Sequence, residues 1–373
     1  MKNCKRDFGI IKKKEIIIIS SYCEDISKIF FKLGYSVFVI SLFKSLKLRK
    51  FCKQIYLVNN FRTKTIQKIL IKIDKEEKKS ILICSGIAEL INTDLIQSRE
   101  NKGNSYQTFK QINSPKNFFG KLSNNKIKIP EFSFQKKENE TWLVKSSKSL
   151  GGNKVFLSSK KKINGNEWYY QKKIIGDVFS VQFFCKENDI EILSTCSIIT
   201  QVIGKFPFYL NGIITKKLNH EKVKEVSKIV TVTSKLFSLN GFNNIDLIYD
   251  EECKKIKVLE LNPRPGLSTK MNERKLFKLF RSKLFDTHEF VNPKNFYSSS
   301  IIYSKKNFEV GAKHLNFLKK LPEKKFSELP IKFEIIKKNQ PICLLHLRSN
   351  NKEILKSKIN HWTYNVGQKL FEI

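Results

Sequence analysis

Two short apolar runs, residues 243–249 and 256–261, carry the side chains best suited to chemistry. The polar segment between them is typical of a β-hairpin. If the hairpin is centred near Cys253, strand pairing places Asp246 directly opposite Glu260. Two carboxylates that face each other destabilise a bare sheet, and a divalent cation between them removes this repulsion. The spacing therefore predicts a metal site on one face of the hairpin.

Alternation of side chains along the strands extends the same prediction. It directs Leu259 toward the core and places Val258, paired with Ile248, on the face of Glu260 and Asn262. The Asn262 side chain then supplies a neutral oxygen beside the carboxylates. A small number of hard oxygen ligands suits Mg²⁺, and Mn²⁺ is the alternative ion. Nucleotide phosphates would supply the remaining ligands.

Arg264 follows the second run and lies between two prolines that fix the backbone. A guanidinium held beside a metal is a natural partner for a phosphate or an acyl-phosphate. The alternative is a turn with a solvated arginine. The register of Asp246 with Glu260 favours the functional interpretation.

A second candidate region begins at the short strand 142–145, which ends in Lys145. The loop that follows contains Gly151 and Gly152, where main-chain N–H groups can approach phosphates closely. Lysine supplies a compact positive charge for the same ligand. A glycine pair alone is weak evidence, so this region depends on its neighbours for its interpretation.

The hairpin resembles the metal-binding hairpin of the ATP-grasp family, which ends in an acidic residue, a hydrophobic residue and Asn-Pro-Arg. This resemblance implies that Asp246, Glu260 and Asn262 hold magnesium and that Arg264 contacts the reacting phosphate or intermediate. The strand ending in Lys145 and its glycine loop are similar to the lysine and flexible lid of the family. Serine follows Lys145 where the family usually has proline, and the lid has only two glycines.

The resemblance also implies an adenine site about twenty residues further on, at 169–176, where family members hold the base with main-chain groups. The residues assigned to nucleotide binding there are Gln171, Lys172, Lys173 and Ile174. The alternative is a plain core strand ending at Gly176. A further phosphate-contacting lysine is customary before the lid, and spacing does not separate Lys116 from Lys121.

Hydrophobic periodicity places these motifs in an α/β and α+β architecture. Alternating strand and helix signals over 15–84 predict a parallel sheet with helices on both faces, in a Rossmann-like domain at 1–112 without a dinucleotide fingerprint. By resemblance, residues 113–290 form the ATP-grasp fold of two α+β subdomains, with the lid at about 130–175. Residues 291–373 are expected to form a small β-rich subdomain.

Composition limits the function classes. The net charge of +37 favours nucleic-acid binding in general, but lysines are spread along the whole chain together with excess Asn, Ile and Phe. That joint excess is what AT-rich codons produce, so nucleic acid is an unfavoured partner. No apolar run approaches the length of a membrane span, and the eight cysteines show no metal-ligand spacing. We expect a cytoplasmic protein with reduced cysteines.

The resemblance implies an ATP-dependent, ADP-forming ligase that activates a carboxylate as an acyl-phosphate for attack by an amine. Within the ATP-grasp family, the sequence most resembles the branch that contains carbamoyl-phosphate synthase and biotin carboxylase. In that branch it is similar to a group linked to one-carbon cofactor pathways. The implied partners are small carboxylate and amine substrates, and the oligomeric state stays open. The rival functions are a nucleotide- or nucleic-acid-binding protein without catalysis and a bicarbonate-using carboxylase subunit.

Overall fold

Four parallel strands near the N-terminus form the first sheet of the computed structural model. The structure describes residues 14–135, 137, 141–160, 167–187, 189–282, 290 and 292–372. The sheet order is β3-β2-β1-β4, with β1 (Glu15–Ser20), β2 (Ser36–Ser41), β3 (Gln54–Leu57) and β4 (Ser80–Ile83). Helices α1 (Glu24–Lys32) and α2 (Thr63–Ile73) connect the strands. The predicted β-α-β build is confirmed.

The apolar run of β1 shows why this sheet must be covered on both faces. Ile16 and Ile18 belong to one core cluster, and Ile17 and Ile19 belong to another. All four side chains are fully buried. A strand with apolar side chains on both faces is stable only between two layers of helices or loops.

Two short helices lead from this sheet to the rest of the molecule. Helix α4 (Pro115–Asn124) has proline at its first position, and the Ser114 side chain caps it by accepting a hydrogen bond from Asn117 N. Helix α3 (Tyr106–Ile112) precedes it in the chain. Its N-terminus is capped by Ser105, whose hydroxyl oxygen accepts from Thr108 N.

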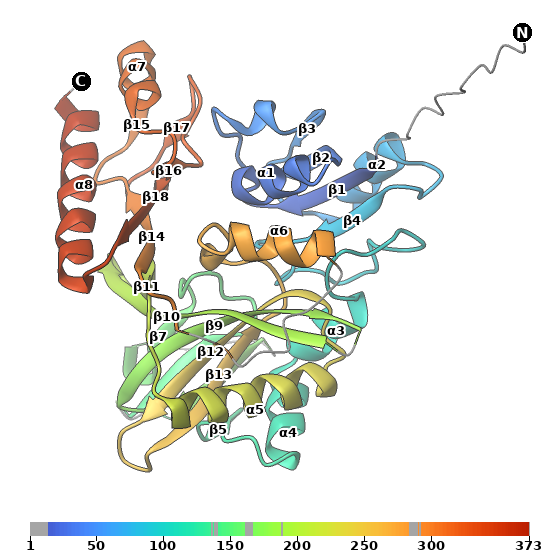
Figure 1. Ribbon diagram of the computed structural model, residues 1–373, viewed down its shortest axis with the longest axis vertical. Coiled ribbons are helices and arrows are strands. Elements are labelled where there is room, and N and C mark those ends of the chain that lie inside the picture. The colour runs from blue at the N-terminus through green and yellow to red at the C-terminus, as the bar shows by residue number, and fades with distance from the viewer. Residues whose placement is uncertain are drawn as a thin grey trace, which may run out of the picture.

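An eight-stranded sheet forms the centre of the molecule (Figure 1), in the order β13-β12-β9-β10-β11-β14-β18-β16. Its strands are β9 (Gly176–Lys186), β10 (Asp189–Ile203), β11 (Phe206–Thr215), β12 (Gly241–Asp250), β13 (Lys255–Asn262), β14 (Phe296–Tyr303), β16 (Phe326–Ser327) and β18 (Pro341–Ser349). Helix α5 (His220–Leu236) packs on one face, and the Asn219 side chain caps it by accepting a hydrogen bond from Lys222 N.

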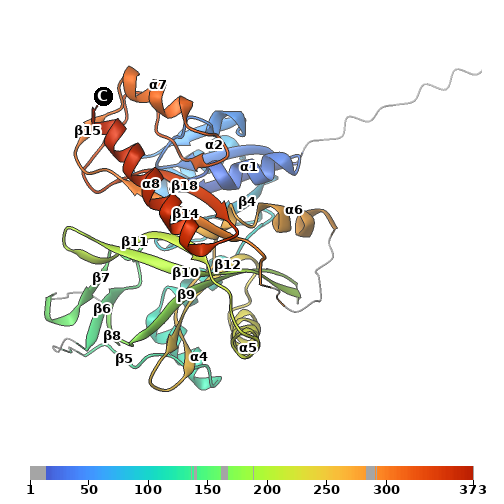
Figure 2. The same cartoon turned by 60° about the vertical axis from the view of Figure 1, so that its left-hand side comes forward.

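A smaller antiparallel sheet precedes the large one in the chain. Its order is β5-β8-β6-β7, with β5 (Phe132–Ser133), β6 (Trp142–Ser146), β7 (Val155–Leu157) and β8 (Trp168–Lys172). It occupies the segment predicted as the lid. In Figure 2 these strands lie beside β9, β10 and β11 of the large sheet.

Helix α6 (Glu273–Ser282) lies between the N-terminal sheet and the large sheet (Figure 1). Its Leu276 and Leu279 share a core cluster with Ile16 from β1 and with Phe184 and Phe242 from the large sheet. The helix therefore joins the two sheets through a common apolar core.

The C-terminal segment contains more helix than the sequence predicted. Helices α7 (Ala312–Lys320) and α8 (Lys352–Glu372) accompany the two-residue strands β15 (Phe308–Glu309) and β17 (Ile335–Ile336). Helix α8 lies along β14 and β18 (Figure 2) and packs Leu355, Val366 and Leu370 into their core. Its apolar residues are sparse among polar ones, so the 3.6-residue period is weak. None of the described helices is long and apolar enough to cross a bilayer.

Candidate functional site

The β12–β13 hairpin sets two carboxylates opposite each other. Asp246 pairs with Glu260 in the antiparallel ladder, which confirms the predicted register at this position. Further toward the turn, Leu247 pairs with Val258 and Ile248 with Lys257. The predicted pair of Ile248 with Val258 is therefore wrong by one residue.

A β-bulge at Leu259 explains the shift. The ladder steps from Val258 to Glu260 while the partner strand advances by one residue, so Leu259 is the additional residue. Val258 is fully buried in the core beside Leu261, and Leu259 lines a cavity with Glu260. The expected positions of Val258 and Leu259 are thus exchanged. Bulges of this kind redirect side chains near sites, and here the bulge leaves Glu260 on the face of Asp246.

The carboxyl groups of Asp246 and Glu260 lie close enough to shift each other's pKa. Burial and the negative charge of Glu260 raise the pKa of Asp246 to about 8. Burial also acts to raise the pKa of Glu260, but the positive charge of Lys145 and hydrogen bonds from Asp246 and Asn262 hold it below its ordinary value. At neutral pH the pair therefore shares one proton when no cation is bound. A divalent cation would displace this proton and allow both groups to ionise.

Lys145 reaches the carboxylates from the small sheet. It lies on β6 and is 7% exposed. Its positive charge helps to lower the pKa of Glu260 and partly opposes the rise in the pKa of Asp246. Its Nζ donates a hydrogen bond of 3.2 Å to Gln171 Oε1 on β8. The predicted lysine therefore sits beside the predicted metal site.

Gln171 carries an unsatisfied donor. The residue is 1% exposed, and its Nε2 has no hydrogen-bond partner within the described part of the chain. A buried amide donor without a partner costs free energy and is expected to have one in the working state. Because Gln171 lines the same cavity as Lys145, a ligand with acceptor atoms fits this position.

Two main-chain N–H groups after Gln171 form hydrogen bonds within the protein. Lys172 N donates to Glu131 O at 2.8 Å, and Lys173 N donates to Thr141 O at 2.7 Å. Among the described residues, the N–H of Ile174 has no such partner. Of the residues predicted to hold the base, Ile174 therefore offers the free main-chain donor.

The two glycines of the lid loop have positive φ, +58° at Gly151 and +78° at Gly152. A Cβ at Gly152 would lie 2.0 Å from the Phe208 carbonyl oxygen. Leu210 N also donates to Gly151 O at 2.9 Å. The sequence suggested that glycine is needed here so that the main chain can approach a phosphate. The structure adds a second reason, because the main chain at Gly152 also lies close to β11.

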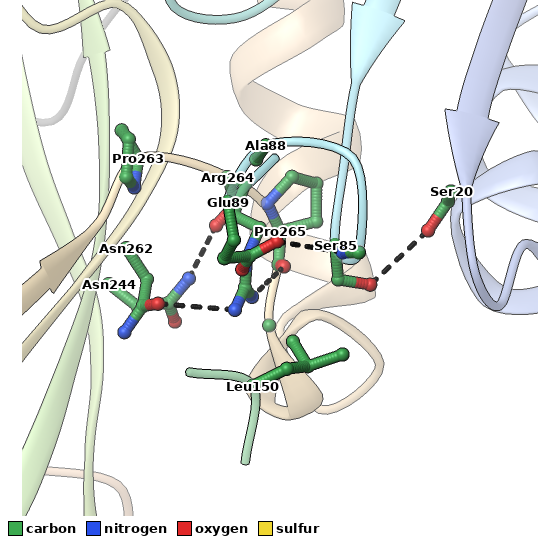
Figure 3. A network of polar contacts seen from close by, with 12 residues as sticks. Ser20, Ser85, Ala88, Glu89, Leu150, Asn244, Asn262, Pro263, Arg264 and Pro265 are labelled. Atoms are coloured by element: carbon green, nitrogen blue, oxygen red, sulfur yellow. Dashed lines mark hydrogen bonds and ion pairs between the residues drawn. The ribbon is translucent and has the colours of Figure 1, made fainter. Parts of the chain in front are cut away.

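Arg264 joins the hairpin to the N-terminal domain (Figure 3). Its Nε donates to Glu89 Oε1 at 2.5 Å, and its terminal nitrogens donate to Asn262 Oδ1 at 3.1 Å and to Pro265 O at 3.2 Å. Asn262 Nδ2 in turn donates to Glu260 Oε1 at 3.1 Å. The amide oxygen predicted as a metal ligand is thus occupied by Arg264 in this state.

Glu89 is the residue that sequence reasoning missed. It is 9% exposed, and its second carboxylate oxygen accepts from Gly86 N at 2.8 Å, which fixes it on the turn after β4. One signal was present in the sequence: Glu89 follows a buried parallel strand, and ligand sites gather at the carboxyl ends of such strands. Nothing in the spacing connected it to Arg264, which lies 175 residues away.

The predicted site residues line one cavity of about 600 Å³. They are Lys145, Gly151, Gly152, Gln171, Lys172, Lys173, Ile174, Asp246, Glu260, Asn262 and Arg264. The two candidates for a further lysine do not line it: Lys116 is exposed, and Lys121 donates to Gln111 at 2.8 Å.

A second cavity of about 440 Å³ adjoins the first. Arg264, Gly266, Leu267, Gly151 and Leu210 line both cavities. The second cavity extends from there to the carboxyl ends of β1 and β4 and to the C-terminal segment. Arg264 therefore stands where the two cavities meet.

Comparison with known proteins agrees with this geometry. Residues 113–268 match the family model of the ATP-grasp domain. The chain contains an ATP-grasp domain. A comparison of the sequence with curated proteins found no match.

Solved structures resemble the whole chain and not only its ATP-grasp domain. N5-carboxyaminoimidazole synthetase from Staphylococcus aureus, complexed with ADP, is 14% identical with a TM-score of 0.69, over 94% of this chain and 97% of that chain. L-amino acid ligase from Bacillus licheniformis is 13% identical with a TM-score of 0.67, over 94% and 97%. The biotin carboxylase domain of Hydrogenobacter thermophilus 2-oxoglutarate carboxylase, solved with MgADP and bicarbonate, is 11% identical with a TM-score of 0.69, over 93% and 88%. At such identities the likeness establishes the fold.

The donor set of the ATP-grasp domain fits magnesium bound together with a nucleotide. Within the described residues, no group of three or more His, Cys, Asp or Glu side chains could hold a metal by itself. Two opposed carboxylates with an adjacent amide leave most of the coordination open. Mg²⁺ prefers such a partial site, because it retains waters and takes phosphate oxygens.

Proposed function

We propose that this protein is an ADP-forming ligase that activates a carboxylic acid with ATP and joins it to an amine. The observation that carries the proposal is the convergence of Asp246, Glu260, Lys145 and Arg264 on one cavity within an ATP-grasp domain. The similar solved structures include a ligase and complexes with ADP and MgADP, which supports the same reaction class.

The nucleotide would bind in the larger cavity. Gln171 Nε2 and Ile174 N–H offer donors for the base, and Lys145 supplies positive charge toward the phosphates. Mg²⁺ held by Asp246 and Glu260 would neutralise phosphate charge and orient the transferred group.

The reaction would proceed in two steps at the junction of the cavities. A carboxylate oxygen of the acid attacks the γ-phosphorus of ATP, ADP leaves, and an acyl-phosphate forms. The amine nitrogen then attacks the acyl carbon and loses a proton, a C–N bond forms, the C–O bond to phosphate breaks, and inorganic phosphate leaves. Arg264 lies between the cavities and can neutralise negative charge on the acyl-phosphate in both steps. Catalysis here depends mainly on positioning and charge, and it needs no side-chain nucleophile.

Glu89 would act as a positioning residue for Arg264. Its carboxylate holds the guanidinium in place and balances its positive charge. This contact links the N-terminal domain to the reacting centre.

The test is a screen of ADP and phosphate formation by the full chain with MgATP and paired acids and amines. The proposal predicts ADP formation that requires both an acid and an amine and that is lost in Glu260→Ala. Release of no ADP, together with no nucleotide binding, would exclude it. Binding of DNA or RNA without nucleotide turnover would favour the non-catalytic alternative instead.

A further inference from the structure

The second cavity contains carboxyl groups that form no ion pair within the described part of the chain. Each cation that lines this cavity already has an acidic partner: Arg264 pairs with Glu89, and Lys270 pairs with Asp25 at 2.8 Å. Glu328 and Glu334 also line the cavity and form no ion pair among the described residues. The cavity walls therefore carry more acidic than basic residues.

This excess runs against the composition of the chain. Lysine and arginine outnumber aspartate and glutamate by 71 to 34, so an acidic residue would readily find a basic neighbour. Glu328 is 8% exposed, and one of its oxygens accepts from Glu24 N at 2.7 Å. Glu334 is half-buried, and one of its oxygens accepts from Ile331 N at 3.2 Å. For both carboxyl groups, no hydrogen bond to the other oxygen is found among the residues that the structure describes.

Burial raises the pKa of Glu334, and burial together with Glu24 raises the pKa of Glu328 well above its ordinary range. This direction is expected for carboxyl groups that lack a counter-charge. A bound cation would supply that charge.

Aromatic rings surround the same end of the cavity. Tyr22 stacks on Phe43 with ring centroids 4.8 Å apart, and Tyr209 meets Tyr303 edge to face at 5.4 Å. Burial raises the pKa of Tyr22, and Glu328 and Glu334 lie close enough to raise it further. Tyrosine rings bind organic cations through their faces, and they also cover the apolar body of a ligand.

We propose that the second cavity binds an organic cation, an amine-bearing substrate with an apolar or aromatic body, through Glu334, Glu328 and the tyrosine rings. This inference rests on the proposed ligase function, since the cavity opens toward Arg264, where the acyl-phosphate would form. The substrate presents its reacting group to Arg264 and its positive charge to the two glutamates. A cavity of about 440 Å³ suits a ligand of the size of an amino acid or a dipeptide.

The test uses matched pairs of compounds that differ in charge and little in shape. The probes are lysine with norleucine, arginine with citrulline, and phenethylamine with phenethyl alcohol. Binding to the full chain is measured by titration calorimetry without nucleotide, and stimulation of ADP formation is measured separately with MgATP. We expect the cationic member to bind at least about tenfold more tightly in one pair or more.

Glu334→Gln should abolish that preference, and Glu334→Lys should reverse it in favour of neutral or acidic compounds. Glu309→Gln is the matched control, because Glu309 is exposed on the strand that pairs with β17 and does not line the cavity. This control variant should prefer the cationic compound as strongly as the wild type does. A wild type that favours neutral or acidic members, or a preference that survives Glu334→Gln, would overturn the proposal. Cation binding without ADP formation from any acid would count against the ligase function and leave the cavity assignment intact.

Discussion

Replacing Asp246 by asparagine should stabilise the metal-free protein while it destroys the cation site. The folded protein binds the Asp246 proton more tightly than the unfolded chain does, because burial and Glu260 raise its pKa from 3.8 to about 8. Between these two values the native state holds more protons, so its stability decreases as the pH rises. Asparagine keeps the size and polarity of the side chain and removes this dependence.

The magnitude follows from the pKa difference. The difference of about four units sets an upper limit of about 6 kcal/mol, at about 1.4 kcal/mol per unit. Asp246 is partly exposed and shares its proton with Glu260, so we expect a gain of about 1–3 kcal/mol at pH 8. The gain should be close to zero at pH 4, where the carboxyl group is neutral in both states.

The assay is urea unfolding followed by circular dichroism in EDTA at pH 4, 6 and 8. Asp189→Asn, at an exposed position on β10, serves as the control and should show no such trend. MgADP should stabilise the wild type and leave Asp246→Asn unchanged. If the variant gained no stability at pH 8, or gained equally at pH 4 and pH 8, the opposed-carboxylate reasoning would be refuted.

Three further substitutions test other parts of the site. Lys145→Met should lower the rate of ADP formation by about 100-fold or more, because it removes a buried charge beside the phosphates, whereas Lys121→Met should stay near the wild-type rate in the same assay. Glu89→Gln should reduce kcat about tenfold with little change in nucleotide affinity, because it loosens the site arginine without touching the nucleotide; an unchanged kcat would contradict its positioning role. Gly152→Ala should destabilise the fold by about 1–3 kcal/mol in thermal unfolding, since its positive φ and the nearby β11 carbonyl leave no room for a Cβ, while Gly120→Ala on α4, with open space around it, should be neutral or stabilising.

Much of the site could be predicted because it depends on local register. Asp246 and Glu260 are 14 residues apart in one hairpin, so strand alternation and turn length were enough to oppose them. The bulge at Leu259 was not visible, because no residue type specifies a single extra residue inside an apolar run. The resulting exchange of Val258 and Leu259 is a side-chain orientation that only tertiary packing decides.

Contacts between distant segments could not be predicted from the sequence. The ion pair of Glu89 with Arg264 and the position of Glu328 and Glu334 in the second cavity depend on how three parts of the chain meet. Helix α8 was missed for a related reason, since it is held by a few apolar contacts to β14 and β18 and has no strong apolar stripe of its own. The parallel sheet, in contrast, was predictable because β1 is apolar on both faces.

Nucleotide binding by titration calorimetry tests the central claim most directly. The titrant is a non-hydrolysable ATP analogue, with and without Mg²⁺, against the wild type and Glu260→Gln. The wild type is expected to bind the analogue much more tightly with Mg²⁺, and Glu260→Gln is expected to lose this gain. No binding to the wild type, or equal binding by both proteins with and without Mg²⁺, would contradict the central claim.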